Sequence, residues 1–229
     1  MRDDLSFWKI TYNEVVVRLM RLPLFPLNVV LFPGGYLPLH IFEERYRLMM
    51  RHCLEGDRRF GVVLISSGSD VGDPAVPEAV GTIAVIDEVR TLDDGRMLIG
   101  VKGERRFRIV EIVEQLPYIT AEVTPLEDDA SPSVDEGLVA EVRQAAKQHI
   151  QMFMALRGEW IEQPALPTDP LQLWYSVGSQ LQGEVIGKQG ILEADDVSNA
   201  LRLALRLLNE ESAELKEQLW DKMGRSTSN

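Results

Sequence analysis

LPLFPLNVVLFPGGYLPLHIFEERY, residues 22–46, is the stretch of sequence that decides the fold. Its short apolar runs are separated by Pro23, Pro26 and Pro33, each of which lacks the amide proton that a continuous β-ladder requires. The stretch therefore predicts edge strands or bulges that border a groove rather than strands inside a sheet. From Glu43 onward the apolar spacing becomes helical, and acidic residues occupy the first turn, where the helix dipole favours them.

The chain then continues in short β-type runs. They are rich in Val, Ile and Thr, which is typical of strands, and they occupy residues 60–66, 81–91, 97–102, 105–114 and 118–125. Asp93-Asp94-Gly95 predicts a hairpin, because glycine tolerates the positive φ of a tight turn. The Gly-, Asp- and Pro-rich segment 67–77 predicts a surface loop. Successive hairpin-linked strands predict a closed or nearly closed antiparallel β-barrel, since closure removes exposed strand edges.

The second half of the chain predicts helices. Apolar residues recur there every three or four positions, as in an amphipathic helical bundle. Asp169 followed by Pro170 is typical of a helix N-terminus. The predicted fold class is α+β, a β-barrel followed by a C-terminal α-helical bundle. The predicted parts are 1–21 (an N-terminal extension or a mis-called start), 22–126 (barrel), 127–135 (linker), 136–224 (bundle) and 225–229 (tail).

Composition excludes several classes of protein. A content of 45% hydrophobic and 26% charged residues is ordinary for a globular protein. No window approaches the roughly 18 consecutive apolar residues of a membrane-spanning helix, and the N-terminus has no apolar stretch of the secretory type. We therefore expect a cytoplasmic protein without a membrane partner. The formal net charge of −12 disfavours nucleic acid, because affinity for phosphates depends on Lys and Arg.

The sequence predicts no catalytic residue, no cofactor and no metal site. Cys53 lies in an apolar helical pattern, so we expect it to be buried, and the three histidines lack metal-ligand spacing. Ser179 and Lys188 are the residue types of a serine-lysine dyad. Neither lies in a strained turn or beside an oxyanion-hole motif, so a helix-face serine and a solvated lysine are the expectation.

Several blocks of the sequence form one recognisable pattern: residues 22–27, 31–34, 37–43, 45–46, 80–84, 94–96, 103, 105–109, 188–189 and 192–193. Together they resemble the N-terminal, substrate-recognition domain of the Lon proteases. The resemblance implies a PUA-like β-barrel followed by a helical bundle, a domain that helps full-length Lon proteases to capture unfolded or tagged substrates. The ATP-binding pattern G-x-x-x-x-G-K-[ST] is absent, and so is the family's peptidase motif P-K-D-G-x-S-A-G. We therefore expect a stand-alone Lon domain that is not an enzyme.

The basic segment Arg105-Arg106-Phe107-Arg108 bears on the main alternative, because related barrels bind RNA. In a strand, Arg106 and Arg108 share the face opposite to Phe107. We therefore expect Phe107 in the core and the arginines partly solvated, paired with the many acidic residues rather than with RNA.

The resemblance implies a non-catalytic module that binds unfolded or exposed hydrophobic polypeptide segments, in protein quality control or proteolysis, with a protease or chaperone as candidate partner. Phe25, Phe32 and Tyr46 are candidates for the groove walls and Glu43 and Arg45 for its rim, since binding energy concentrates in aromatic anchors surrounded by polar groups. The alternative for the aromatics is burial in the barrel core. A nucleic-acid-binding barrel and an enzyme with a small-molecule pocket stay open as other functions, and the oligomeric state is not predicted.

Overall fold

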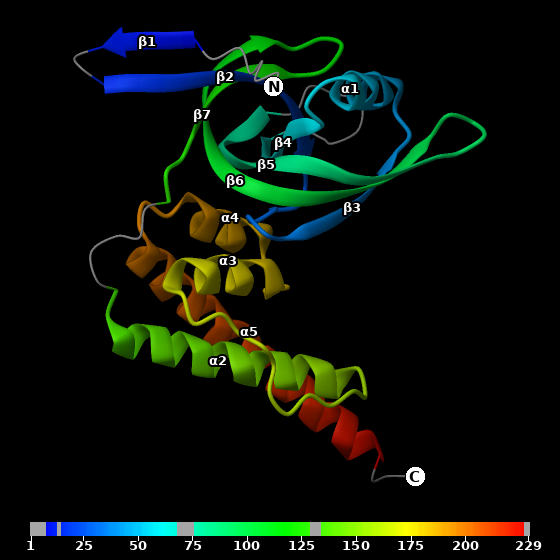
Figure 1. Cartoon of the computed structure of the whole chain (residues 1–229). Helices are drawn as coiled ribbons and strands as arrows, with labels where there is room; N and C mark the ends of the chain where they lie inside the picture. Colours follow the sequence, from blue (N-terminus) through cyan, green and yellow to red (C-terminus); the bar gives the residue numbers. More distant parts are fainter. Residues whose placement is uncertain (1–7, 13–14, 68–75, 129–133, 227–229) are drawn as a thin grey trace. The chain divides into compact units, whose positions relative to one another are not determined.

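The structure is a computed structural model that describes residues 8–12, 15–67, 76–128 and 134–226. The chain forms two compact units, Met1–Glu127 and Asp128–Asn229 (Figure 1). The first unit is built on a sheet and the second on helices. Most of the predicted loop at 67–77, and parts of the predicted linker and tail, lie outside the described residues.

The first unit contains a mixed sheet of seven strands and helix α1 (Glu44–Glu55). The order of strands is β1-β2-β4-β5-β6-β3, and β7 pairs with both β2 and β6. The pairings therefore form a closed circuit that runs from β2 through β4, β5, β6 and β7 back to β2. The strands are β1 (Trp8–Tyr12), β2 (Val15–Leu27), β3 (Tyr36–Ile41), β4 (Arg59–Ser67), β5 (Val76–Thr91), β6 (Met97–Glu114) and β7 (Thr120–Pro125).

The expectation of an all-antiparallel sheet is wrong at one pair of strands. Strands β2 and β4 run parallel, with Leu24 opposite Gly61 and Leu27 opposite Leu64. A parallel pair requires a crossover connection rather than a tight hairpin, and here β3 and α1 supply it. The hairpin between β5 and β6 is as predicted, because Gly95 has φ +80° and its amide donates to the Leu92 carbonyl at 2.9 Å.

The prolines of the opening stretch do not break β2, which corrects the prediction of short interrupted strands. The strand instead changes partner along its length: 15–19 pair with β1, 20–23 with β7, and 24–27 with β4. Each stretch thus carries a ladder on one side, so Pro23 and Pro26 can face the other side without losing a hydrogen bond. The predicted extension at 1–21 includes β1 and the first part of this strand.

Two apolar cores cover the two faces of the sheet. Neighbouring residues alternate between them: Leu24 belongs to one and Phe25 to the other. The continuous buried run 60–64 in β4 follows from this arrangement, because a strand covered on both faces has no polar side. Phe107 is fully buried, as predicted. The core beneath α1 contains Phe25, Tyr46, Met49, Met50, Phe60 and Val62; the other contains Leu22, Leu24, Val63, Ile83, Phe107 and Val123.

The second unit consists of α2 (Glu136–Leu156), α3 (Pro170–Gln180), α4 (Val185–Glu193) and α5 (Val197–Ser226). The predicted N-cap is confirmed, because the Asp169 carboxylate accepts a hydrogen bond from the Gln172 amide at 2.9 Å and Pro170 follows it. Trp174 is fully buried, and its indole nitrogen donates to the Ile191 carbonyl at 3.1 Å. This bond ties α3 to α4.

Hydrogen bonds to the Glu211 carboxylate of α5 connect the helices of this unit. Nε2 of His149 on α2 lies 2.8 Å from its carboxylate, and the amides of Gln182 and Gly183 donate to it at 3.1 and 2.7 Å. Burial raises the pKa of Glu211, but the bonds from His149 and the two amides outweigh burial and leave the pKa below its usual value. The carboxylate therefore stays ionised and holds α2, α5 and the α3–α4 connection.

Candidate functional site

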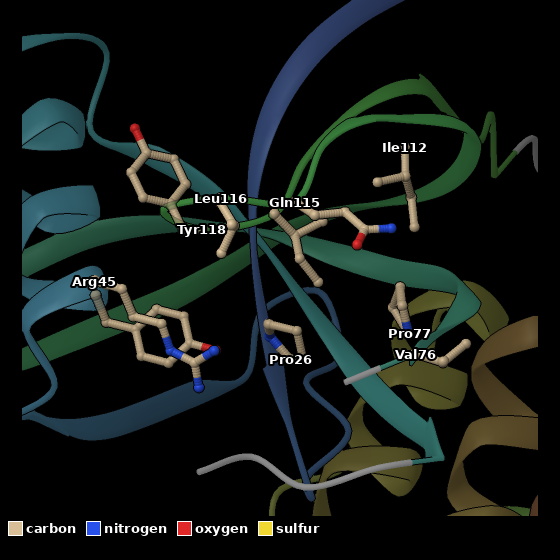
Figure 2. Close-up of a pocket in the computed structure, with 10 residues that line it drawn as sticks. Pro26, Arg45, Val76, Pro77, Ile112, Gln115, Leu116 and Tyr118 are labelled. Carbon is tan, nitrogen blue, oxygen red and sulfur yellow. The ribbon is translucent and has the colours of Figure 1, made fainter. Parts of the chain in front are cut away.

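A pocket of about 400 Å³ opens on the first unit between the end of β2, the start of α1, the start of β5 and the β6–β7 connection. Figure 2 shows Tyr118 and Arg45 on one side of it and Pro77 on the other. Apolar groups dominate the wall. The lining residues are Pro26, Arg45, Tyr46, Val76, Pro77, Ile112, Gln115, Leu116, Tyr118 and Ile119.

The α1 side of the pocket combines an aromatic ring with a positive charge. The Tyr46 ring is buried, and its centroid lies 4.3 Å from that of Phe25 in the core. The Arg45 guanidinium carbon lies 4.6 Å from the centroid of the same ring, a cation–π distance. Nε of Arg45 donates to the Glu43 carboxylate at 3.0 Å. Glu43 therefore orients the Arg45 guanidinium. The contacts with Glu43 and with the Tyr46 ring both hold this side chain in place without a ligand.

Another part of the wall comes from the β6–β7 connection. Leu116 is 81% exposed at the rim. Ile119, three residues further along the chain, is buried, and its carbonyl accepts from the Leu24 amide at 2.8 Å. The Tyr118 hydroxyl lies 2.7 Å from Nδ1 of His52 on α1. Burial, followed by the neighbouring Cys53 and Glu114, raises the pKa of Tyr118, so its hydroxyl stays neutral. The connection is thus anchored on both sides while its leucine faces solvent.

The sequence-predicted site residues divide into two groups. Arg45 and Tyr46 line the pocket, and Glu43 is bonded to Arg45 without lining it. Phe25 and Phe32, predicted as walls, do not line it: both are buried, and Phe32 is only 1% exposed. The alternative interpretation, burial in the core, describes these two phenylalanines. It also applies to Tyr46, which is buried in the same core as Phe25 although it lines the pocket.

Sequence reasoning missed the β6–β7 connection. Ile112, Leu116 and Tyr118 contribute to the pocket wall, yet no pattern singled them out. The available signal was Leu116 beside Pro117 between two strands, where an apolar side chain has no neighbouring strand residue to cover it.

The described residues offer no obvious nucleophile or metal centre. Burial, then the nearby Asp57, raises the pKa of Cys53 to about 12, so its thiol is inert at neutral pH. Ser179 is exposed, as expected, but Lys188 is partly buried rather than solvated, and its Nζ donates to the Leu181 carbonyl at 2.8 Å. No group of three or more His, Cys, Asp or Glu side chains among these residues could hold a metal ion.

The basic segment of β6 differs from its prediction at one position. Phe107 is in the core, and Arg105 and Arg108 are exposed, but Arg106 is only 3% exposed. The expectation that Arg106 is partly solvated is wrong. Arg106 lies opposite Thr82 in the ladder, and Thr82 is itself fully buried with its hydroxyl bonded to the Leu31 carbonyl at 2.6 Å. Alternation identifies the face of a residue but not whether a second layer covers that face.

None of the helices in the described ranges is both long and apolar enough to cross a membrane.

Comparison with known proteins gives a family for most of the chain. Residues 21–210 match the family model described as the ATP-dependent protease La (LON) substrate-binding domain. "Lon protease 2" of Myxococcus xanthus is 30% identical over 200 residues, which cover 85% of this chain and 24% of that protein. "Lon protease" of Cytophaga hutchinsonii is 28% identical over 211 residues, 88% of this chain and 26% of that protein. The chain thus spans about a quarter of the length of these relatives.

Solved structures agree with the family match. The crystal structure of a Lon N-terminal domain protein from Xanthomonas campestris aligns with a TM-score of 0.63 at 26% identity, covering 82% of this chain and 98% of that one. The N-terminal domain of a Mycobacterium avium complex Lon protease has the same fold, with a TM-score of 0.62 at 20% identity and coverage of 82% and 98%. The chain therefore belongs to the LON substrate-binding domain family.

Proposed function

We propose that the first unit captures unfolded or exposed hydrophobic segments of other polypeptides in the pocket beside Arg45 and Tyr46. The observation that carries the proposal is an 81% exposed leucine, Leu116, at the rim of an apolar pocket in a substrate-binding family. Membership of that family makes a polypeptide the natural occupant.

Physical chemistry supports a hydrophobic occupant. Covering one exposed leucine contributes about 1.5–3 kcal/mol, and other large apolar side chains of β6, Val110, Ile112 and Val113, are also exposed. Arg45 and Gln115 add polar groups at the pocket, where they can bond the backbone carbonyls of a bound segment. Apolar walls with a few fixed polar groups are what a binding site needs to combine affinity with orientation.

We propose further that capture involves no ATPase or peptidase chemistry of this chain. The family match lies in a substrate-binding domain, and neither the ATP-binding loop nor the peptidase motif is present in the sequence. Purified protein is therefore expected to hydrolyse neither ATP nor casein. Hydrolysis that persists through several columns and is lost on mutation of a residue of this chain would contradict this part of the proposal.

The test of capture is the affinity for a fluorescently labelled, permanently unfolded model protein, measured by anisotropy. Leu116→Asp places a charge at the pocket rim, and we expect it to weaken binding at least about tenfold, which corresponds to ~1.4 kcal/mol. Ile186→Asp is the matched control, because Ile186 on α4 is 75% exposed and lies in the second unit. We expect the control to bind like the wild-type protein.

Circular dichroism of both variants confirms that they fold before binding is compared. Equal affinity of Leu116→Asp and wild type for the client would remove this pocket from consideration. Tighter binding of single-stranded RNA than of the unfolded client, with a steep dependence on salt, would favour the nucleic-acid alternative instead.

The same proposal includes the finer architecture. We infer that the closed circuit of pairings in the first unit is a PUA-like barrel, with residues 22–126 as the barrel and 136–224 as the bundle. The continuous pairing from β2 back to β2 supports this inference.

A further inference from the structure

A second hollow, with a volume of about 330 Å³, lies in the second unit against α2. Its polar lining consists of Arg143, Gln144 and Lys147 from α2 and Gln163 from the α2–α3 connection. The connection is fastened to the helix one turn further on, where Nε2 of Gln151 donates to the Glu162 carbonyl at 2.8 Å. The hollow is therefore bounded by a helix and a segment held against it.

The charges in this hollow are one-sided. Arg143 and Lys147 are four residues apart on α2, so their side chains lie on the same face of the helix. Among the described residues, no carboxylate lines the hollow, and neither cation belongs to a salt bridge.

Arg143 also has an unused donor. Its Nε is buried and has no hydrogen-bond partner. A buried N–H that bonds nothing is costly, and in native proteins such groups call for an explanation. An anion in the hollow would bond the terminal N–H groups of this guanidinium, whose planar fork matches two oxygens of a phosphate. Nε gains a partner when the side chain turns toward the ligand.

We infer that this hollow binds a compact phosphate-bearing anion. Arg143 holds two of its oxygens through the guanidinium fork, and Lys147 adds a point charge on the same side. The amides of Gln144 and Gln163 can donate to the remaining oxygens. No aromatic side chain lines the hollow in the described part of the chain, so the ligand is of inorganic-phosphate or pyrophosphate type rather than a nucleotide whose base must stack.

The test measures binding of inorganic phosphate, pyrophosphate and citrate to the full chain by isothermal titration calorimetry at constant ionic strength. We expect saturable binding, tightest for pyrophosphate, and a loss of about tenfold in affinity in Arg143→Gln/Lys147→Gln, because charge-assisted hydrogen bonds are removed. Arg202→Gln/Arg206→Gln is the matched control: it removes two charges at the same spacing on α5, outside the hollow. The control is expected to bind like wild type.

A milder variant, Arg143→Lys, keeps the charge but removes the fork, and it should weaken pyrophosphate binding while leaving the melting temperature of the unliganded protein unchanged. Absence of saturable binding, or an equal loss of affinity in the two double variants, would overturn the inference. Tighter binding of citrate than of pyrophosphate would overturn the assignment to phosphate. A Tm of wild type that rises with pyrophosphate, and of Arg143→Gln/Lys147→Gln that does not, is the independent supporting result.

Discussion

Replacing Gly61 with alanine tests how tightly the buried side chains pack against strand β4. An alanine Cβ built there would lie 2.6 Å from Cζ of Phe107 and 2.6 Å from Cδ2 of Leu24, and both of these side chains are fully buried. Carbon atoms do not approach so closely, so the ring or the strand must move. Overpacking of this kind typically costs about 1–3 kcal/mol, whereas Phe107→Ala costs about 3–5 kcal/mol through loss of a buried ring.

The two changes should compensate each other. In Gly61→Ala/Phe107→Ala the new methyl group occupies space that the ring has vacated, so the double variant should be more stable than the sum of the two single effects by about 0.5–3 kcal/mol. Urea melts of all four proteins give the free energies of unfolding. Strict additivity, or a neutral Gly61→Ala, would refute the argument that the ring fills this space. Gly190→Ala is the control, because nothing lies within 4 Å of its added methyl group, and a gain of about 0.5–1 kcal/mol is expected in helix α4.

Three further predictions follow from burial and charge. Arg106→Ala should destabilise by about 1–3 kcal/mol because it empties a buried polar position, whereas the exposed Arg108→Ala should cost under ~1 kcal/mol; equal urea midpoints would contradict the burial of Arg106. The folded-state pKa of Glu211 is lowered, so its contribution to stability is present above the unfolded-state pKa of about 4.5 and is lost as pH falls through the folded-state pKa. Thermal melts across acidic pH should therefore show that wild type loses its stability advantage over Glu211→Gln in this range. A difference that stays constant with pH would contradict the role of the Glu211 carboxylate in holding the helices together. Cys53, with a pKa of about 12, should react with a thiol reagent at neutral pH only after urea unfolds the protein, and rapid labelling of the folded chain would show otherwise.

Local signals in the sequence predicted local structure well. The Gly95 turn, the Asp169 cap and the burial of Phe107 each depend on a few neighbouring residues. A positive φ strongly favours glycine, an N-cap favours a short acceptor side chain, and alternation places an aromatic on one face of a strand. None of these inferences needs to know which distant segment lies alongside.

Pairing between distant segments could not be predicted in the same way. Pro23 and Pro26 indicate only that a ladder is missing on one side, and either an edge strand or a strand that changes partner satisfies that condition. β2 takes the second course. The burial of Arg106 could not be predicted for the same reason. The residue opposite it, Thr82, bonds a distant segment that includes Leu31, and no pattern within β6 indicates that this segment lies there.

The pocket combines both kinds of information, and the sequence pointed to only two of its ten lining residues, Arg45 and Tyr46. Arg45 and Tyr46 belong to a segment rich in proline and aromatic residues, and that composition indicated a binding site there. Leu116 and Tyr118 belong to the connection between β6 and β7. A connection has no regular alternation of apolar residues, so an exposed apolar side chain there does not stand out in the sequence. An aromatic in an apolar run is usually placed in the core, as Phe25 and Phe32 are, because the free energy of burying a ring is gained most fully there. A leucine in a connection between strands, such as Leu116, is not covered by a packed core. The proposed capture site therefore depends on an apolar residue beside a proline in a connection, Leu116, and not on the most aromatic stretch of the chain.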